Sequence, residues 1–187
     1  RLFLNYISLA ILGSLRVLFI NKKFDRILVF GASPVTIGIP AIVAKYWFKA
    51  PIFFWVQDLW PESITAAGGI ENKFILNSVN CLTKFIYKES KKVLVQSRAF
   101  IPYILNQNVC NNKIIYLPNS TEIFYNKIEI NNKYKKLMPK NGPILMFAGN
   151  IGEAQGFDTI IKSAKFLVDS GVNVNWVILG DGRQREM

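Results

Sequence analysis

The sequence contains no histidine and only two cysteines among its 187 residues. Without histidine, this span cannot provide a histidine-based catalytic triad or the ligands of most catalytic zinc sites. The cysteines, Cys81 and Cys110, lack the spacing of a metal-binding motif and are too few for a disulfide framework. This cysteine usage favours a reducing compartment.

Acidic residues are scarce, with 12 Asp and Glu against 23 Lys and Arg and a formal net charge of +11. Such an excess predicts attraction to an anionic partner, which is nucleic acid, a membrane surface or a phosphorylated substrate. The basic residues are scattered in short clusters, without zinc-finger spacing or an RNA-recognition motif. We therefore expect no nucleic-acid partner and favour the other two.

A long uninterrupted apolar run is also missing. The segment Leu2–Ile20 is about long enough to span a membrane, but Asn5, Ser8, Ser14 and Arg16 interrupt it. One charge near a helix centre costs about 2.5–3.5 kcal/mol on insertion scales. No clear basic start or cleavage site indicates a signal peptide. We predict a helix packed on a sheet and leave open whether one face contacts a membrane.

Apolar residues make up 51% of the chain, enough for a core, and they alternate between strand-like and helix-like patterns. The predicted strands are residues 26–30, 51–56, 92–96 and 114–117. Helices are predicted over 37–48 and 99–106, and a helix face with apolar spacings of four, three and four residues is predicted over 75–86. This repetition predicts an α/β fold with a parallel, doubly wound sheet of the Rossmann type.

The composition changes after residue 120. Residues 121–142 are polar and basic, which predicts an interdomain linker. The α/β pattern then restarts with a predicted strand over 143–148, a helix over 157–169 and a strand over 175–179. We therefore predict a first domain over 1–120, a linker over 121–142 and one βαβ unit of a second domain over 143–187.

Polar groups follow the second predicted strand. Gln57, Asp58, Trp60 and Glu62 come just past its carboxyl end, and Pro61 stiffens the turn. In an open parallel sheet this edge is where ligands bind. The alternative interpretation is structural, with Trp60 packed as a lid and Asp58 capping a helix.

A glycine-rich turn, residues 149–156 (Gly-Asn-Ile-Gly-Glu-Ala-Gln-Gly), joins a strand to a helix in the second predicted domain. Glycines there allow backbone amides to approach a phosphate, and the helix N-terminus adds partial positive charge. The spacing fits neither the dinucleotide-binding fingerprint nor the P-loop. Many such turns are glycine-rich for packing alone, so both interpretations stay open.

Four segments taken together resemble a known family: residues 58–62 (Asp-Leu-Trp-Pro-Glu), 117–119 (Leu-Pro-Asn), 147–156 and 178–182 (Ile-Leu-Gly-Asp-Gly). In this order they cover nearly the whole chain. They resemble a bacterial family 4 glycosyltransferase of the GT-B type, which has two Rossmann-like domains. Residues 58–62 resemble the subgroup that builds O-antigen, capsule and exopolysaccharide.

The sequence departs from the family pattern at the cations that stabilise the leaving diphosphate. Much of the family has Arg and Lys where this chain has Asn150 and Gln155. These amides donate hydrogen bonds without charge, worth typically about 1 kcal/mol each against about 1.5–3 kcal/mol for ionic ones. The family often has His-Asp where this chain has Gln57-Asp58.

The resemblance implies a retaining glycosyltransferase that moves a sugar from a nucleotide-sugar to a lipid-diphosphate-linked or saccharide acceptor. It implies no metal or other cofactor, and a peripheral location at the cytoplasmic face of the inner membrane. The implied catalytic residues are Gln57, Asp58 and Glu62. The implied substrate-binding residues are Asn119, Gly149, Asn150, Gly152, Gln155, Gly156 and Gly180.

Two rival functions remain: a nucleotide-sugar epimerase of the same architecture, and a non-catalytic Rossmann-like binding domain. An epimerase would normally bring histidine and acidic catalysts, and histidine is absent over this span. We also expect the basic amphipathic stretch 73–92, together with the opening helix, to dock on anionic lipid.

The two chain ends have the character of internal positions. The chain opens on Arg1 inside an apolar segment and closes on residues 180–187, after a strand where another helix would follow. We therefore expect an internal fragment of a longer enzyme that is inactive in glycosyl transfer by itself.

Overall fold

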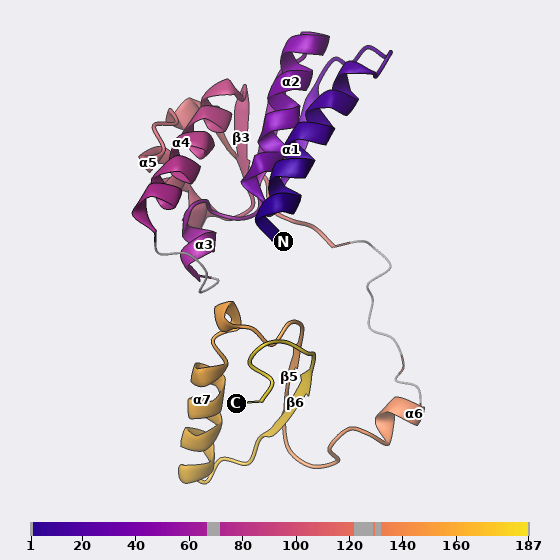
Figure 1. Cartoon of the computed structure of the whole chain (residues 1–187). Helices are drawn as coiled ribbons and strands as arrows, with labels where there is room; N and C mark the ends of the chain where they lie inside the picture. The colour runs from indigo at the N-terminus through magenta and orange to yellow at the C-terminus, as the bar shows by residue number, and fades with distance from the viewer. Residues whose placement is uncertain (1, 67–71, 122–128, 130–131, 187) are drawn as a thin grey trace. The chain divides into compact units, whose positions relative to one another are not determined.

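A computed structural model describes residues 2–66, 72–121, 129 and 132–186 of the chain (Figure 1). The chain divides into two compact units. The first is formed by Arg1–Thr65 with Ile70–Ser120, and the second chiefly by Thr121–Met187.

The first unit is built on a parallel sheet of four strands in the order β1-β2-β3-β4. The strands are β1 (Ile27–Gly31), β2 (Ile52–Val56), β3 (Lys92–Val95) and β4 (Ile114–Tyr116). Each predicted strand is present, with each end shifted by at most one residue. The parallel α/β class predicted for this unit is confirmed.

One helix of the first unit precedes the first strand, and the others lie between successive strands in the α/β pattern. They are α1 (Leu2–Leu18), α2 (Gly38–Phe48), α3 (Glu62–Ala66), α4 (Lys73–Glu89) and α5 (Ile101–Asn106). Short 3-10 turns, Val35–Ile37 and Arg98–Phe100, precede α2 and α5, so the helices predicted over 37–48 and 99–106 each begin as a 3-10 turn. Asn72 caps α4, since its side-chain oxygen accepts from the amides of Phe74 and Ile75.

The core lies on one face of this sheet. Residues in register across the strands, such as Val29, Phe54 and Val93, point to the same face and are buried. Side chains from α2, α4 and α5 join them in a single cluster: Ala41, Ile86, Tyr87 and Ile104. A sequential strand order places successive right-handed crossovers on the same side, so the doubly wound arrangement is wrong for the described part of this sheet.

On the opposite face, the edge strand β1 presents Leu28 and Phe30, which are 64% and 53% exposed. Phe30 packs edge-on against Trp55 of the neighbouring strand, with ring centroids 5.4 Å apart.

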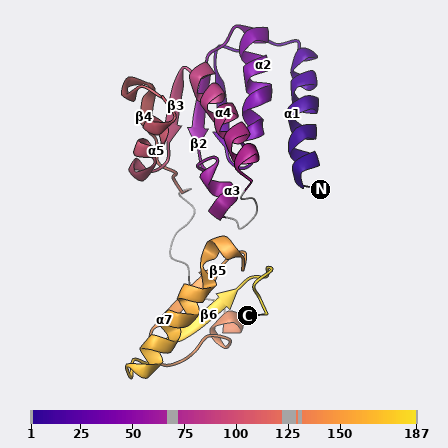
Figure 2. The same cartoon turned by 60° about the vertical axis from the view of Figure 1, so that its left-hand side comes forward.

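Helix α1 lies beside α2 rather than on the sheet, which corrects the predicted packing partner (Figures 1 and 2). The two helices run in the same direction: Tyr6 accepts a hydrogen bond from Thr36, and a β-carbon on Gly13 would touch Pro40. Among the helices of the described residues, none is long and apolar enough to cross a membrane.

The second unit contains two parallel strands and a helix, the βαβ pattern predicted from the sequence. Strands β5 (Ile144–Ala148) and β6 (Asn175–Leu179) pair in register, and α7 (Phe157–Asp169) connects them. In the predicted linker, residues 122–128 and 130–131 lie outside the described part. A short helix that the sequence did not predict, α6 (Asn132–Lys135), follows them.

Candidate functional site

The carboxyl edge of the first sheet gathers polar side chains from all four strands. Ser33 follows β1, Gln57 and Asp58 follow β2, Gln96 follows β3 and Asn119 follows β4. Because the strands are parallel, their carboxyl ends meet at one edge, where open α/β sheets bind ligands. Hydrogen bonds join these five residues into two groups.

Asp58 belongs to the first group. One of its carboxylate oxygens, Oδ2, accepts hydrogen bonds from the backbone N–H of Ser33 at 2.9 Å and from the Ser33 hydroxyl at 2.7 Å. The amides of Ser63 and Ile64 at the start of α3 donate instead to backbone carbonyls. Asp58 therefore ties the ends of β1 and β2 together, and the structure gives it this cross-strand role in place of the helix cap considered above.

Three amides form the second group. Asn119 donates from Nδ2 to Gln57 Oε1 at 2.8 Å and, more weakly, to Gln96 Oε1 at 3.4 Å. Gln96 in turn donates from Nε2 to the Gln57 backbone carbonyl at 3.1 Å. The Nε2 atom of Gln57 is buried and has no hydrogen-bond partner among the described residues. A buried donor without an acceptor is costly, so this atom is suited to an oxygen atom of a ligand.

Trp60 and Glu62 are placed differently from Asp58. Trp60 is 9% exposed and packs in the core of the first unit, as the structural alternative proposed. Glu62 opens α3 and is exposed. Burial raises the pKa of the Tyr87 phenol, and the Glu62 carboxylate adds to that rise. Within the described residues, no hydrogen bond joins Glu62 to Gln57 or Asp58.

In the second unit, two glycine turns meet at the carboxyl ends of β5 and β6. The Gly149 amide donates to Leu179 O at 2.9 Å, and the Ile151 amide donates to Asp181 O at 2.8 Å. A β-carbon on Gly180 would overlap the carbonyl oxygen of Gly149, so only glycine fits this approach. The predicted residues Gly149 and Gly180 are thus direct neighbours.

The two amide side chains of the first turn lie next to Gly152. Asn150 Nδ2 and Gln155 Oε1 are 2.6 and 2.9 Å from the position that a β-carbon on Gly152 would take. Gly156, in the left-handed region at φ 62°, then opens α7. The structure therefore brings Gly180 next to Gly149, at the turn that also holds Asn150, Gly152, Gln155 and Gly156.

Sequence reasoning missed Ser33 and Gln96 as members of the first edge. The signal was available, because both stand at the exit of a predicted strand, as Gln57 and Asn119 do. Their hydrogen-bond partners could not be predicted from the sequence, because hydrogen bonds across strand ends depend on which strands are neighbours.

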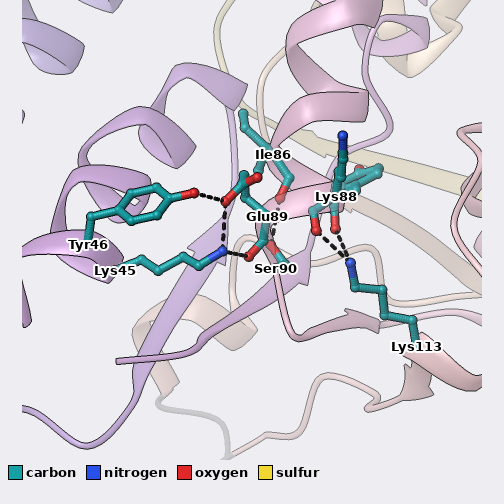
Figure 3. Close-up of polar contacts among 8 residues, drawn as sticks. Lys45, Tyr46, Ile86, Lys88, Glu89, Ser90 and Lys113 are labelled. Atoms are coloured by element: carbon teal, nitrogen blue, oxygen red, sulfur yellow. Dashed lines mark hydrogen bonds and ion pairs between the residues drawn. The ribbon is translucent and has the colours of Figure 1, made fainter. Parts of the chain in front are cut away.

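A different polar cluster ties α2 to the end of α4 (Figure 3). Lys45 Nζ donates to Glu89 Oε2 at 2.7 Å and to the Glu89 carbonyl at 2.9 Å, and the Tyr46 hydroxyl donates to Oε2 at 2.6 Å. The Lys45 hydrogen bond first, and that of Tyr46 second, hold the pKa of Glu89 below its ordinary value. Because the helices run opposite to the strands, this cluster lies at the amino edge, away from Asp58.

Lys113 closes the same end of α4. Its Nζ donates to the carbonyls of Tyr87 at 2.9 Å and Lys88 at 2.7 Å, which satisfies acceptors that the helix end leaves unpaired (Figure 3). Burial lowers the pKa of Lys113, with a smaller contribution from the charge of Lys45. We assign both clusters at this edge a structural role.

In the part of the chain that the structure describes, no three Cys, Asp or Glu side chains gather closely enough to hold a metal ion. No protein-family model matches the sequence, and a search of curated proteins found no match. A functional assignment for this chain therefore depends on its residues and its fold.

Proposed function

We propose that the chain is part of a retaining glycosyltransferase that moves a sugar from a nucleotide-sugar to a lipid-diphosphate-linked or saccharide acceptor in cell-surface polysaccharide synthesis. The second unit would bind the donor and the first unit the acceptor. Gln57, Asp58 and Glu62 would act on the acceptor side, and the paired glycine turns would hold the donor diphosphate.

The observation that carries this proposal is the pairing of the two glycine turns at the carboxyl ends of β5 and β6. The contact of Gly180 with the Gly149 carbonyl holds the two turns together, and the space beside Gly156, where a β-carbon would meet no atom within 4 Å, is open to a phosphate group at the amino end of α7. Asn150 and Gln155 stand at the same turn and supply side-chain amides that donate to phosphate oxygens. Such a site suits a diphosphate.

Asn150 and Gln155 are uncharged, so the leaving diphosphate would be stabilised without a cation at these two positions. Neutral donors stabilise a diphosphate less than charged ones, at typically about 1 kcal/mol per hydrogen bond. Backbone amides and the partial charge at the amino terminus of α7 would therefore supply a larger share of the stabilisation. In the first unit, the unpartnered Gln57 Nε2 would donate to an acceptor oxygen, and Asp58 would be kept in orientation by Ser33.

Two other functions use the same geometry. A nucleotide-sugar epimerase would bind the same donor and change its stereochemistry without an acceptor. A non-catalytic domain would bind the nucleotide and release it unchanged. Neither has a specific observation in its favour, and both are distinguished by the fate of the bound sugar.

Titration calorimetry with UDP, GDP, UDP-glucose and GDP-mannose tests the donor site. We expect one of these nucleotides to bind and the variant Asn150→Ala/Gln155→Ala to bind it at least tenfold more weakly, since two hydrogen bonds of about 1 kcal/mol are lost. Asn173→Ala is the matched control, because Asn173 is an exposed amide of the same unit at its other end.

The sugar is then followed with a radiolabelled donor. Transfer to a lipid-linked acceptor by a longer chain containing this sequence supports the glycosyltransferase, and a labelled epimer without acceptor supports the rival enzyme. Nucleotide binding without either product supports a binding domain. If the double variant binds as tightly as Asn173→Ala, the glycine turns serve packing and the proposed donor site is wrong.

A further inference from the structure

Helix α1 is apolar around most of its circumference, yet only one side of it is covered. Ala10 is buried against the rest of the unit, whereas other large side chains of α1 and the residue after it are 39–76% exposed: Leu4, Ile7, Leu9, Ile11, Leu12, Leu15, Leu18 and Phe19. A helix that is apolar on all sides is normally buried. The outward face of α1 therefore requires a partner.

An apolar groove of about 500 Å³ runs between α1 and α2. Its lining is Ile7, Ala10, Ile11, Ser14, Leu15, Leu18, Thr36, Ile39 and Val43. The two hydroxyl groups in it are already used, because Ser14 donates to Ala10 O at 2.6 Å and Thr36 donates to Tyr6 O at 3.2 Å. The groove thus offers no free polar side chain, which makes it suited to hydrocarbon and unsuited to a polar ligand.

Leu18 also lines a second hollow, of about 810 Å³, which adjoins the apolar groove at the carboxyl ends of α1 and α2. Three of the side chains in this hollow are basic, Lys22, Lys23 and Lys49, and one is acidic, Asp25. The aromatic residues in its lining are Phe19, Phe24, Trp47 and Phe48. Trp47 is 54% exposed.

We propose that this α1–α2 surface, the lining of the two hollows with the exposed face of α1, docks on an anionic lipid bilayer. The apolar side chains of α1 would enter the boundary between headgroups and acyl chains, as interfacial helices do. Phe19 would enter with them, Trp47 would lie at headgroup depth, where tryptophan is enriched, and Lys22 and Lys23 would attract anionic headgroups.

Charge favours lipid over a second copy of the chain as the occupant. A two-fold interface brings the same surface patch of each copy together. The basic residues Lys22, Lys23 and Lys49 would then face one another around a shared axis with a single carboxylate per copy, Asp25, to offset them. An anionic bilayer satisfies both the apolar groove and its basic rim.

The expectation from the sequence combined the opening helix with the stretch 73–92; the surface proposed here keeps α1 and has α2 and residues 18–25 in place of that stretch. Helix α4 turns Thr83, Ile86 and Tyr87 into the core of the first unit, so much of its apolar face is already covered. The docking surface proposed here does not rest on the proposed glycosyl transfer, since it involves neither Asp58 nor the glycine turns.

Co-sedimentation of the full chain with vesicles tests the role of the lysines in the docking surface. We expect binding to vesicles of phosphatidylglycerol with phosphatidylcholine and weak binding to phosphatidylcholine alone. Lys22→Ala/Lys23→Ala should weaken partitioning into the anionic vesicles by about thirtyfold, since each lysine near such a surface contributes about a factor of five. Lys162→Ala/Lys165→Ala, two exposed lysines of α7, changes the net charge equally and should bind like the unaltered chain.

Replacement of exposed apolar side chains tests their role in the docking surface. Leu12→Ser/Phe19→Ser should reduce partitioning and should remove the part of the binding that survives high salt. Phe166→Ser/Val168→Ser on α7, where both residues are at least 69% exposed, is the matched control. Lipids carrying a nitroxide near the headgroup should quench the fluorescence of Trp47, and Trp47→Phe should lose that component.

Three results would overturn the proposal. The first is an unaltered chain that does not bind anionic vesicles at low salt. The second is equal weakening by the two lysine pairs, which would mean that net charge alone drives binding. The third is a dimer, measured by light scattering, that Leu12→Ser/Phe19→Ser converts to a monomer, which would assign the surface to a second copy of the chain.

Discussion

Ser33 and Asp58 lie 25 residues apart, and the Asp58 carboxylate accepts hydrogen bonds from both the backbone and the hydroxyl of Ser33, at 2.9 and 2.7 Å. This contact joins the ends of two neighbouring strands at the edge where ligands bind in such sheets. Asp58, which was predicted as a catalytic residue, therefore also holds the ends of β1 and β2 together. Function and stability at Asp58 have to be separated by experiment.

Replacement of Asp58 by alanine is expected to lower the free energy of unfolding on the order of 1 kcal/mol, because two exposed hydrogen bonds are lost and water replaces them. Glu62→Ala should change it by less than about 0.5 kcal/mol, since Glu62 is an exposed residue at the start of α3. Chemical denaturation followed by circular dichroism gives both values. Ser33→Ala is the control, because it removes part of the same contact and keeps the carboxylate. If Ser33→Ala and Asp58→Ala reduce substrate turnover equally in a longer, active chain that contains this sequence, Asp58 acts through structure alone.

Gly180→Ala is expected to disrupt the second unit. The added β-carbon would overlap the Gly149 carbonyl oxygen, which belongs to the backbone and has no rotamer by which to move aside. A loss of about 3 kcal/mol or more is expected, within the range for steric conflict with a fixed backbone. Gly149→Ala is a matched control, since its β-carbon would meet only the ring of Phe147 at 3.3 Å. Amide hydrogen exchange of β5 and β6 measures the effect, and equal protection in both variants would contradict it.

The Glu89 contacts predict a loss of stability in acid. Hydrogen bonds from Lys45, and then from Tyr46, lower the pKa of Glu89 in the folded chain below its ordinary value of 4.5. A carboxyl with a depressed folded pKa stabilises the fold above the unfolded pKa, and this contribution disappears as the pH falls from about 4.5 through the folded pKa. The difference in unfolding free energy between the unaltered chain and Glu89→Gln should therefore be constant near neutrality and shrink below about pH 4.5.

Tyr46→Phe provides the internal comparison for this acid effect. It removes one of the two side-chain donors to Glu89 Oε2 and leaves the Lys45 ion pair in place. Its pH profile should lie between those of the unaltered chain and Glu89→Gln. A difference between the unaltered chain and Glu89→Gln that does not vary between neutral pH and acid would show that the ion pair has no energetic role.

The 187 residues by themselves are expected to show no glycosyl transfer. In the second unit α7 is the helix that connects the two strands, and Leu145, Met146, Ile178 and Leu179 of these strands are 43–53% exposed. So small a unit buries little apolar surface and is marginal in stability. Transfer requires donor and acceptor held in orientation, which accounts for about 7–11 kcal/mol of a barrier. A radiolabelled transfer assay with purified chain tests this, and measurable turnover would falsify it.

Local patterns in the sequence determined the elements of this protein. Helix α7 and strand β6 have the predicted ends, and the ends of the four strands of the first sheet differ from the predicted ones by at most one residue. Residues that end a strand were also visible, which is why Gln57 and Asp58 were predicted, whereas Asn119 was implied by the family resemblance. Apolar periodicity and turn residues act over a few positions, so a single sequence carries them directly.

Only the tertiary structure decided which of these residues meet. The sequential order of the strands makes Ser33 the neighbour of Asp58, places Asn119 against Gln57 and keeps the helices on one face of the first sheet. The same holds for Gly149 beside Gly180, and for α1 beside α2 rather than on the sheet. Strand order and helix partners depend on the burial of apolar surface between segments far apart in the chain. The free energy gained by that burial must exceed the entropic cost of closing the intervening loops. That balance is a property of the whole fold, and no local pattern in the sequence records it.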